Sequence, residues 1–86
     1  MSKRFISNND FLRFCNDYIE VYDWVEIVKG KYNIKGADFS VQGLFMEVDD
    51  NKIIMNIDND YYSYSVNEIL IFMFGEEYFY LYENFS

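Results

Sequence analysis

The chain has 86 residues, 51% of them hydrophobic and 22% aromatic, and its formal net charge is −8 at pH 7. This length fits a single domain spanning residues 1–86, and large aromatic rings bury enough area to give so small a domain a core. With one cysteine and no histidine, the sequence excludes an internal disulfide, a cysteine-rich metal site and the catalytic triads that need histidine.

A helix is predicted over residues 8–22. Ser7 and Asn8 are suitable N-cap residues, and Asp10 would lie in the first turn, where the helix dipole favours a carboxylate. Apolar residues recur at spacings of three and four, as in an amphipathic helix: Phe11, Leu12, Phe14, Cys15, Tyr18, Ile19 and Tyr22. Cys15 is among them, and we expect it to be a small buried hydrophobe.

The connector that follows is basic and open to two interpretations. Residues 24–28 fit either a short strand or a continuation of the helix, and residues 32–34 alternate like another short strand. Lys29, Lys31 and Lys35 give this region its charge. We expect no direct nucleic-acid binding through them, because a protein of charge −8 repels a polyanion; pairing with the protein's own acids is the simpler role.

Residues 39–49 are predicted to form a strand with a bulge. In a regular strand, Phe39 and Val41 would point to one face of the sheet, whereas Leu44, Met46 and Val48 would point to the other. The change between the two faces falls at Gln42-Gly43. Glycine tolerates the conformation of a β-bulge, so we place the bulge there.

The rest of the chain is predicted to form strands joined by tight turns. Aspartate, asparagine and glycine mark the turns, and Ser65–Glu68 has the form of a capping box that opens one helical turn. The predicted strands cover residues 53–57, 61–65, 69–74 and 78–82. In the last of them, Phe79 and Leu81 would face opposite to the neighbouring tyrosines. The fold class is therefore α+β: an N-terminal amphipathic helix packed on a curled antiparallel sheet, or partly open barrel, of four to five strands.

The charge is concentrated in the C-terminal part of the chain. Residues 1–35 hold six basic and five acidic groups, whereas residues 36–86 hold ten acidic groups and one basic group, Lys52. Turn preference explains each acid separately but not the missing cations. This imbalance favours a basic partner over a merely solvated acidic surface.

The candidate partner-binding residues combine turn acids with strand tyrosines. Carboxylates would meet arginine or lysine, and tyrosine contributes area and a hydroxyl group to an interface. We expect Tyr62 and Tyr64 to pair across the sheet with the C-terminal tyrosines. The candidates are Asp49, Asp50, Asp58, Asp60, Glu76, Glu77, Tyr62, Tyr78 and Tyr80. The alternative is a solvated sheet face, since tyrosine is a good strand former.

No cofactor, metal or catalytic residue is predicted. Asp58-Asn59-Asp60 starts like a calcium loop but is followed by Tyr61-Tyr62-Ser63, so the EF-hand pattern fails. The longest apolar run, Ile69–Phe74, is far shorter than the roughly 20 residues of a membrane span, and no signal peptide is visible. We expect a soluble, cytoplasmic protein without membrane contact and without enzyme activity.

These features predict a small acidic binding protein that blocks a basic surface of a protein partner. Nucleic-acid-binding proteins are the natural source of such surfaces, because their channels attract polyanions. The chain is similar in size, acidity and lack of catalytic residues to phage inhibitors of host defence, including anti-CRISPR and anti-restriction proteins. That resemblance implies a nucleic-acid mimic acting in the host cytoplasm.

Two alternatives stay open. In the first, the strand over residues 78–82 is a sheet edge that pairs with a second copy, which gives a self-assembling module or homodimer. In the second, the chain is an immunity protein that neutralises a toxin by the same acidic surface.

Overall fold

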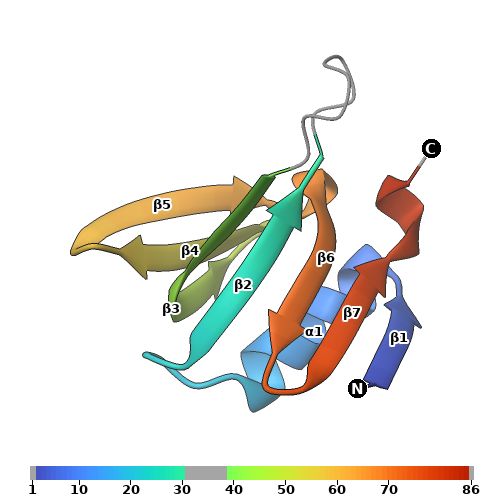
Figure 1. The fold of residues 1–86 in the computed structure, drawn as a ribbon, viewed down its shortest axis with the longest axis horizontal. Coiled ribbons are helices and arrows are strands. Elements are labelled where there is room, and N and C mark those ends of the chain that lie inside the picture. Colours follow the sequence, from blue (N-terminus) through green and yellow to red (C-terminus); the bar gives the residue numbers. More distant parts are fainter. Residues whose placement is uncertain (1, 31–38, 86) are drawn as a thin grey trace.

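Seven strands form one sheet against which one α-helix packs in the computed structural model, which describes residues 2–30 and 39–85 (Figure 1). The order across the sheet is β1-β7-β6-β2-β3-β4-β5. The elements are β1 (Ser2–Ile6), α1 (Asn8–Tyr18), β2 (Trp24–Lys29), β3 (Phe39–Asp49), β4 (Lys52–Ile57), β5 (Asp60–Ser65), the 3-10 turn η1 (Val66–Glu68), β6 (Ile69–Phe74), β7 (Glu77–Leu81) and the 3-10 turn η2 (Tyr82–Asn84). The predicted α+β class is confirmed.

The predicted count of four to five antiparallel strands is wrong, because the described sheet has seven strands and is mixed. β1 was not predicted at all: it runs parallel to β7, whereas the other neighbouring strands are antiparallel. Residues 24–28 belong to a strand rather than to the helix. The strand predicted over residues 32–34 lies outside the described residues.

Helix α1 begins as predicted and ends four residues early. The Ser7 hydroxyl oxygen accepts a hydrogen bond from the Asp10 amide at 3.2 Å, which satisfies a free donor of the first turn. After Tyr18 the chain turns away to contact β3: the Tyr22 amide donates to the Phe45 carbonyl at 2.7 Å, and the Phe45 amide donates to the Asp23 carbonyl at 2.8 Å. The Ile19 amide still donates to the Cys15 carbonyl at 3.3 Å, but the Tyr22 amide bonds to β3 instead of continuing the helix.

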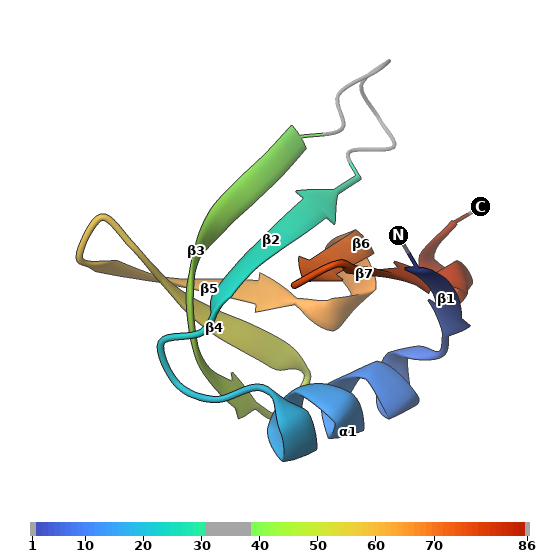
Figure 2. The same ribbon diagram turned by 60° about the horizontal axis from the view of Figure 1, so that its bottom comes forward.

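The core lies between α1 and one face of the curled sheet, which we call the inner face (Figure 2). Its aromatic centre joins the helix to β6 and β7: the rings of Phe11 and Phe72 are 4.8 Å apart and those of Phe14 and Phe79 are 4.6 Å apart. Phe79 and Leu81 are fully buried, as the alternation in the last strand predicted. Cys15 is also fully buried, which confirms its role as a small core residue.

The bulge in β3 lies at Met46 and not at Gln42-Gly43. The register with β4 shifts between Phe45 and Glu47, whereas the register with β2 is regular through Gly43. Gly43 belongs to the inner face, where an added Cβ would lie 2.7 Å from the Asn56 carbonyl oxygen. The alternation of apolar residues was misleading in this strand. Gly43 takes an inward position but has no side chain, and the apolar residue next to it, Leu44, points outward.

The turns follow the predicted chemistry. Asp58 and Asn59 have φ angles of 54° and 71° and join β4 to β5 as a two-residue turn, the arrangement of a type I′ hairpin. Gly75 has a φ of 63° between β6 and β7. The Ser65 hydroxyl accepts a hydrogen bond from the Asn67 amide at 3.3 Å, so the predicted single helical turn is confirmed as η1.

The described sheet does not close into a barrel, and its edges are β1 and β5. β7 therefore lies inside the sheet, between β6 and β1, and the expectation that the C-terminal strand is an edge is wrong. The strand that covers it comes from the other end of the chain, where Ser2 lies opposite Glu77.

Candidate functional site

The three acidic turns lie at separate places on the sheet. Asp49 and Asp50 stand at the β3–β4 turn, and Asp58 and Asp60 stand at the β4–β5 turn, at the opposite end of β4. A strand of six residues spans about 20 Å, so the two pairs do not form one patch. Glu76 belongs to the third turn, between β6 and β7.

Cations compensate these turns unequally. Lys52 lies directly across from Asp49 in the ladder between β3 and β4. Glu77 forms an ion pair with Arg4, with 3.0 Å between Nε and Oε1, although Oε1 has no aligned hydrogen bond. Within the part of the chain that the structure describes, no ion pair involves Asp58 or Asp60. Of the three acid pairs Asp49-Asp50, Asp58/Asp60 and Glu76-Glu77, the one at the β4–β5 turn therefore has the least compensating positive charge.

The predicted tyrosine pairing across the sheet is wrong. Tyr62 is on β5, whereas Tyr78 and Tyr80 are on β7, with β4, β3, β2 and β6 between the two strands. Tyr80 packs against Phe5 of β1, with ring centroids 5.4 Å apart. Two tyrosine groups therefore exist instead of one, at opposite sides of the sheet.

Strand β5 is the most exposed strand that carries predicted site residues. Its tyrosines Tyr61 and Tyr62 are 67% and 45% exposed, and it forms with β4 the hairpin that extends away from the body in Figure 1. Tyr62 stacks on Tyr64 with a centroid distance of 6.5 Å. Burial, and next the neighbouring Tyr62, raises the pKa of Tyr64, so this hydroxyl stays neutral at physiological pH.

Two shallow hollows adjoin the outer face of this hairpin. The first has a volume of about 200 Å³ and extends from Trp24, which is 60% exposed, to the turn residues Asp58 and Asn59. The second has a volume of about 290 Å³ and is lined by Met46, Glu47, Ile54 and Tyr61. Trp24, Glu47 and Tyr61 were not predicted as site residues. Strand alternation places Tyr61 outward, but the sequence does not show that Tyr61 and Glu47 line the same hollow.

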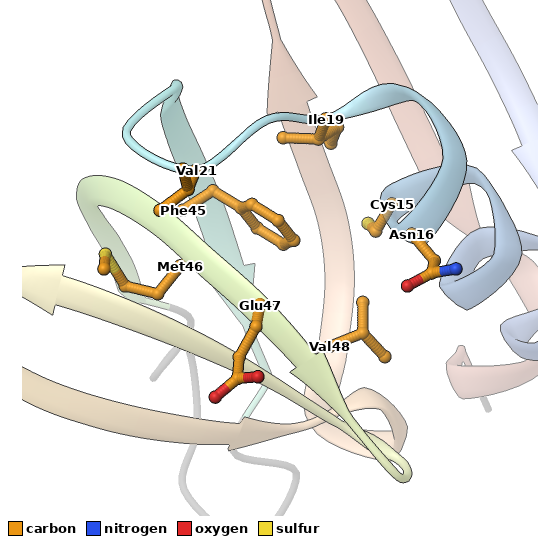
Figure 3. A pocket seen from close by; sticks show the side chains of 8 residues that line it. All are labelled: Cys15, Asn16, Ile19, Val21, Phe45, Met46, Glu47 and Val48. Atoms are coloured by element: carbon orange, nitrogen blue, oxygen red, sulfur yellow. The ribbon is translucent and has the colours of Figure 1, made fainter.

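A third hollow, of about 220 Å³, separates the end of α1 from the second half of β3 (Figure 3). Cys15 and Ile19 line it from the helix side, and Phe45 and Glu47 line it from the strand. Burial raises the pKa of the Cys15 thiol far above its usual range, which leaves almost no thiolate at neutral pH. The hollow therefore offers the Asn16 amide and the Glu47 carboxylate rather than a nucleophile.

The basic connector is partly used by the fold. The Lys29 ammonium lies 3.0 Å from the Glu68 carboxylate and 4.9 Å from the centroid of the Tyr64 ring. Lys31 and Lys35 lie outside the described residues. For Lys29, pairing with the protein's own acid is the role that the structure supports.

Metal-binding groups, membrane-spanning helices and similarity to known proteins are three further features that bear on function. No group of three or more acidic or cysteine side chains within residues 2–30 and 39–85 is arranged to hold a metal ion. In the same residues no helix is long and apolar enough to cross a membrane. Comparison with protein-family models, curated proteins and solved structures finds no match to this chain.

Proposed function

We propose that this chain is a non-enzymatic binding protein that engages a basic surface of a protein partner through the β4–β5 hairpin. The observation that carries the proposal is the composition of the hairpin tip: Asp58 and Asp60 are exposed and make no ion pair with the described residues, and exposed Tyr61 and Tyr62 follow directly. Carboxylates beside large amphipathic rings suit a contact with arginine and lysine.

The charge distribution favours this hairpin over the other predicted acids. Glu77 already has Arg4 beside it, and Asp49 faces Lys52 across the ladder. The one cation on these two strands, Lys52, lies at the end of β4 away from the tip, so the field of the tip reaches solvent with little compensation. A field of this sign raises the association rate with a basic surface at low salt.

Nucleic-acid-binding proteins are the partner class that we propose, because their channels present arginine and lysine to a polyanion. The phage inhibitors of host defence named above are one setting for such a contact. A mimic built on the whole predicted set would need Asp49 and Asp58 to act together, yet they lie at opposite ends of β4. We therefore assign the contact to Asp58 and Asp60 alone.

The test compares two matched double substitutions, Asp58→Asn with Asp60→Asn and Asp49→Asn with Asp50→Asn. Both remove two charges, and asparagine keeps the positive φ found at Asp58 and Asp50. Proteins captured from the native host are quantified by mass spectrometry, with and without duplex DNA as competitor. We expect the first variant to lower affinity about tenfold at low salt and the second to leave it nearly unchanged. Equal losses in both variants, or a captured protein that DNA does not displace, would contradict the proposal.

A further inference from the structure

The outer edge of β5 is an unpaired row of backbone groups. Because Ile57 and Asp60 close a two-residue turn, they form a hydrogen-bonded pair, and alternation then directs the backbone groups of Tyr61, Ser63 and Ser65 away from β4. β5 has no other strand beside it in the described sheet. These amides and carbonyls are free to pair with an added strand.

Residues 61–65 of this edge lack the sequence features that block such pairing. Natural edge strands are usually protected by lysine, proline, a bulge or a charge. Residues 61–65 read Tyr-Tyr-Ser-Tyr-Ser, without charge, proline or glycine, and their ladder with β4 is regular. Tyrosine is a good strand former, and the small serine side chains leave room for a neighbouring strand.

A hollow beside the edge has the chemistry to receive one side chain of an added strand. Ser63 lies opposite Ile54 on the outer face, and its small side chain leaves the way open toward the hollow lined by Met46, Glu47, Ile54 and Tyr61. Met46 and Ile54 suit an aliphatic stem, the Tyr61 ring suits a cation above its face, and Glu47 supplies a negative charge. Arginine combines these features best.

We propose that β5 binds a basic extended segment of the partner as an added strand, with an arginine or lysine opposite Ser63 lodged in this hollow. The inference rests on the proposed function and names the mode by which the basic partner is held. Main-chain hydrogen bonds supply affinity in such strand addition, and alternate side-chain contacts supply specificity. Asp58 and Asp60 attract the segment, and Glu47 fixes its register.

A second copy of the chain is the weaker occupant. Two copies of charge −8 repel each other. The complementary edge, β1, carries Lys3 and Arg4, but Arg4 is paired with Glu77 and Lys3 lies 6.0 Å from the centroid of the Tyr80 ring. A foreign basic strand meets neither obstacle.

The test uses a short labelled peptide that alternates arginine with threonine, and a twin with N-methyl groups on every second amide. Fluorescence anisotropy at low salt gives the affinity of each for the full chain. N-methylation removes the ladder donors without changing the charge, so we expect the methylated peptide to bind at least about tenfold more weakly. Equal affinity of the two peptides, or no binding of either, overturns the inference.

Three variants locate the contact. Ser63→Pro removes an outward N–H, which edge strands tolerate, and we expect it to lower affinity about tenfold, while Ser63→Ala as its control changes affinity less than about twofold. Glu47→Gln should weaken binding about threefold. Circular dichroism confirms that each variant folds. Unchanged affinity in Ser63→Pro overturns the inference.

The failure of this inference is distinguishable from failure of the proposed function. If Asp58→Asn with Asp60→Asn weakens capture of the folded partner while Ser63→Pro leaves it unchanged, the hairpin tip binds the partner without strand addition. A wild-type dimer that Ser63→Pro dissociates, detected by sedimentation without peptide, assigns the edge to a second copy and also overturns the inference.

Discussion

The two edge strands of the sheet, β1 and β5, differ in how their charges are used. β1 carries Lys3 and Arg4, and both cations lie against residues of the neighbouring β7. β5 carries no cation, its one acid, Asp60, is exposed, and its central residues are uncharged. One edge is therefore protected in the manner of natural edge strands, while the other is left open.

This difference shows that the net charge of the chain does not tell how charge is distributed between the two edges of the sheet. The six predicted site acids lie at three turns, and the turns differ in the cations beside them rather than in the number of their acids. Lys3 and Arg4 of β1 offset part of the acidic charge on the β7 side of the sheet, whereas β5 carries no cation. The two sides of the sheet therefore differ in how far their acids are compensated by cations. Substitutions at Gly43, Asn84 and Arg4 test how the two sides are built and joined.

The largest expected effect comes from Gly43, which supports the β5 side. In Gly43→Ala the new Cβ would lie 2.7 Å from the Asn56 carbonyl oxygen and 2.8 Å from Cγ1 of Ile57, so β3 and β4 must separate. We expect a loss of about 2–3 kcal/mol in the free energy of unfolding, measured by urea denaturation. Gly75→Ala is the control: its Cβ meets nothing within 4 Å but its φ is positive, and about 1 kcal/mol is expected. A larger loss at Gly75 would show that crowding at Gly43 is relieved cheaply.

The next effect concerns Asn84, which links the ends of the two sides. The two hydrogens of its amide nitrogen are shared among three acceptors: the carbonyls of Val66 and Ile69 at 2.9 and 2.6 Å and Asn8 Oδ1 at 3.1 Å. Its Oδ1 accepts from the Asn8 amide at 3.0 Å. η1, η2 and the start of α1 meet at this side chain.

Asn84→Ala leaves these partly buried groups without partners, and we expect a loss of about 2 kcal/mol in the free energy of unfolding. Asn67→Ala, which removes one exposed contact with Asn8 at 3.3 Å, serves as the control and should cost less than about 0.5 kcal/mol. Thermal unfolding followed by circular dichroism measures both. Similar small losses in the two variants would mean that packing, not this hydrogen-bond cluster, joins the two sides.

Local patterns in the sequence predicted the elements whose partners are near in the chain. The helix start at Ser7, the strand of residues 69–74 and the single turn after Ser65 each depend on spacing within a few residues. β1 could not be predicted in this way, because Lys3 and Arg4 interrupt its apolar pattern and its partner lies at residues 77–81. Its formation depends on tertiary pairing rather than on propensity.

The candidate site shows the same division. Asp50, Asp58 and Glu76 lie in turns as predicted, and aspartate adopts the required backbone conformation at Asp50 and Asp58. Asp49, Asp60 and Glu77 were also predicted in turns but are the terminal residues of β3, β5 and β7. Which acids share a surface depends on strand order, and the order separates Tyr62 from Tyr78 by four strands. Glu47 became a candidate only through the bulge at Met46, because its register with Ile54 follows from the shifted ladder.

The smallest expected effect concerns Arg4, the cation that closes the β1 side. Its Nε lies 3.0 Å from Glu77 Oε1 and its guanidinium lies 5.5 Å from the centroid of the Phe79 ring, but both charged side chains are about half exposed. Solvent screens such a pair, so the coupling energy between Arg4→Ala and Glu77→Gln in a double-mutant cycle should be below about 1 kcal/mol.

The coupling should also fall as salt is added, because screening increases with ionic strength. Lys3→Ala, the neighbouring cation without an ion pair among the described residues, controls for the overall change in charge. Urea denaturation at two salt concentrations gives all four free energies of the cycle. A coupling above about 2 kcal/mol that salt does not change would make Arg4 a structural requirement of the β1–β7 pair. The charge difference between the two edges would then follow from stability rather than from selection for a basic partner.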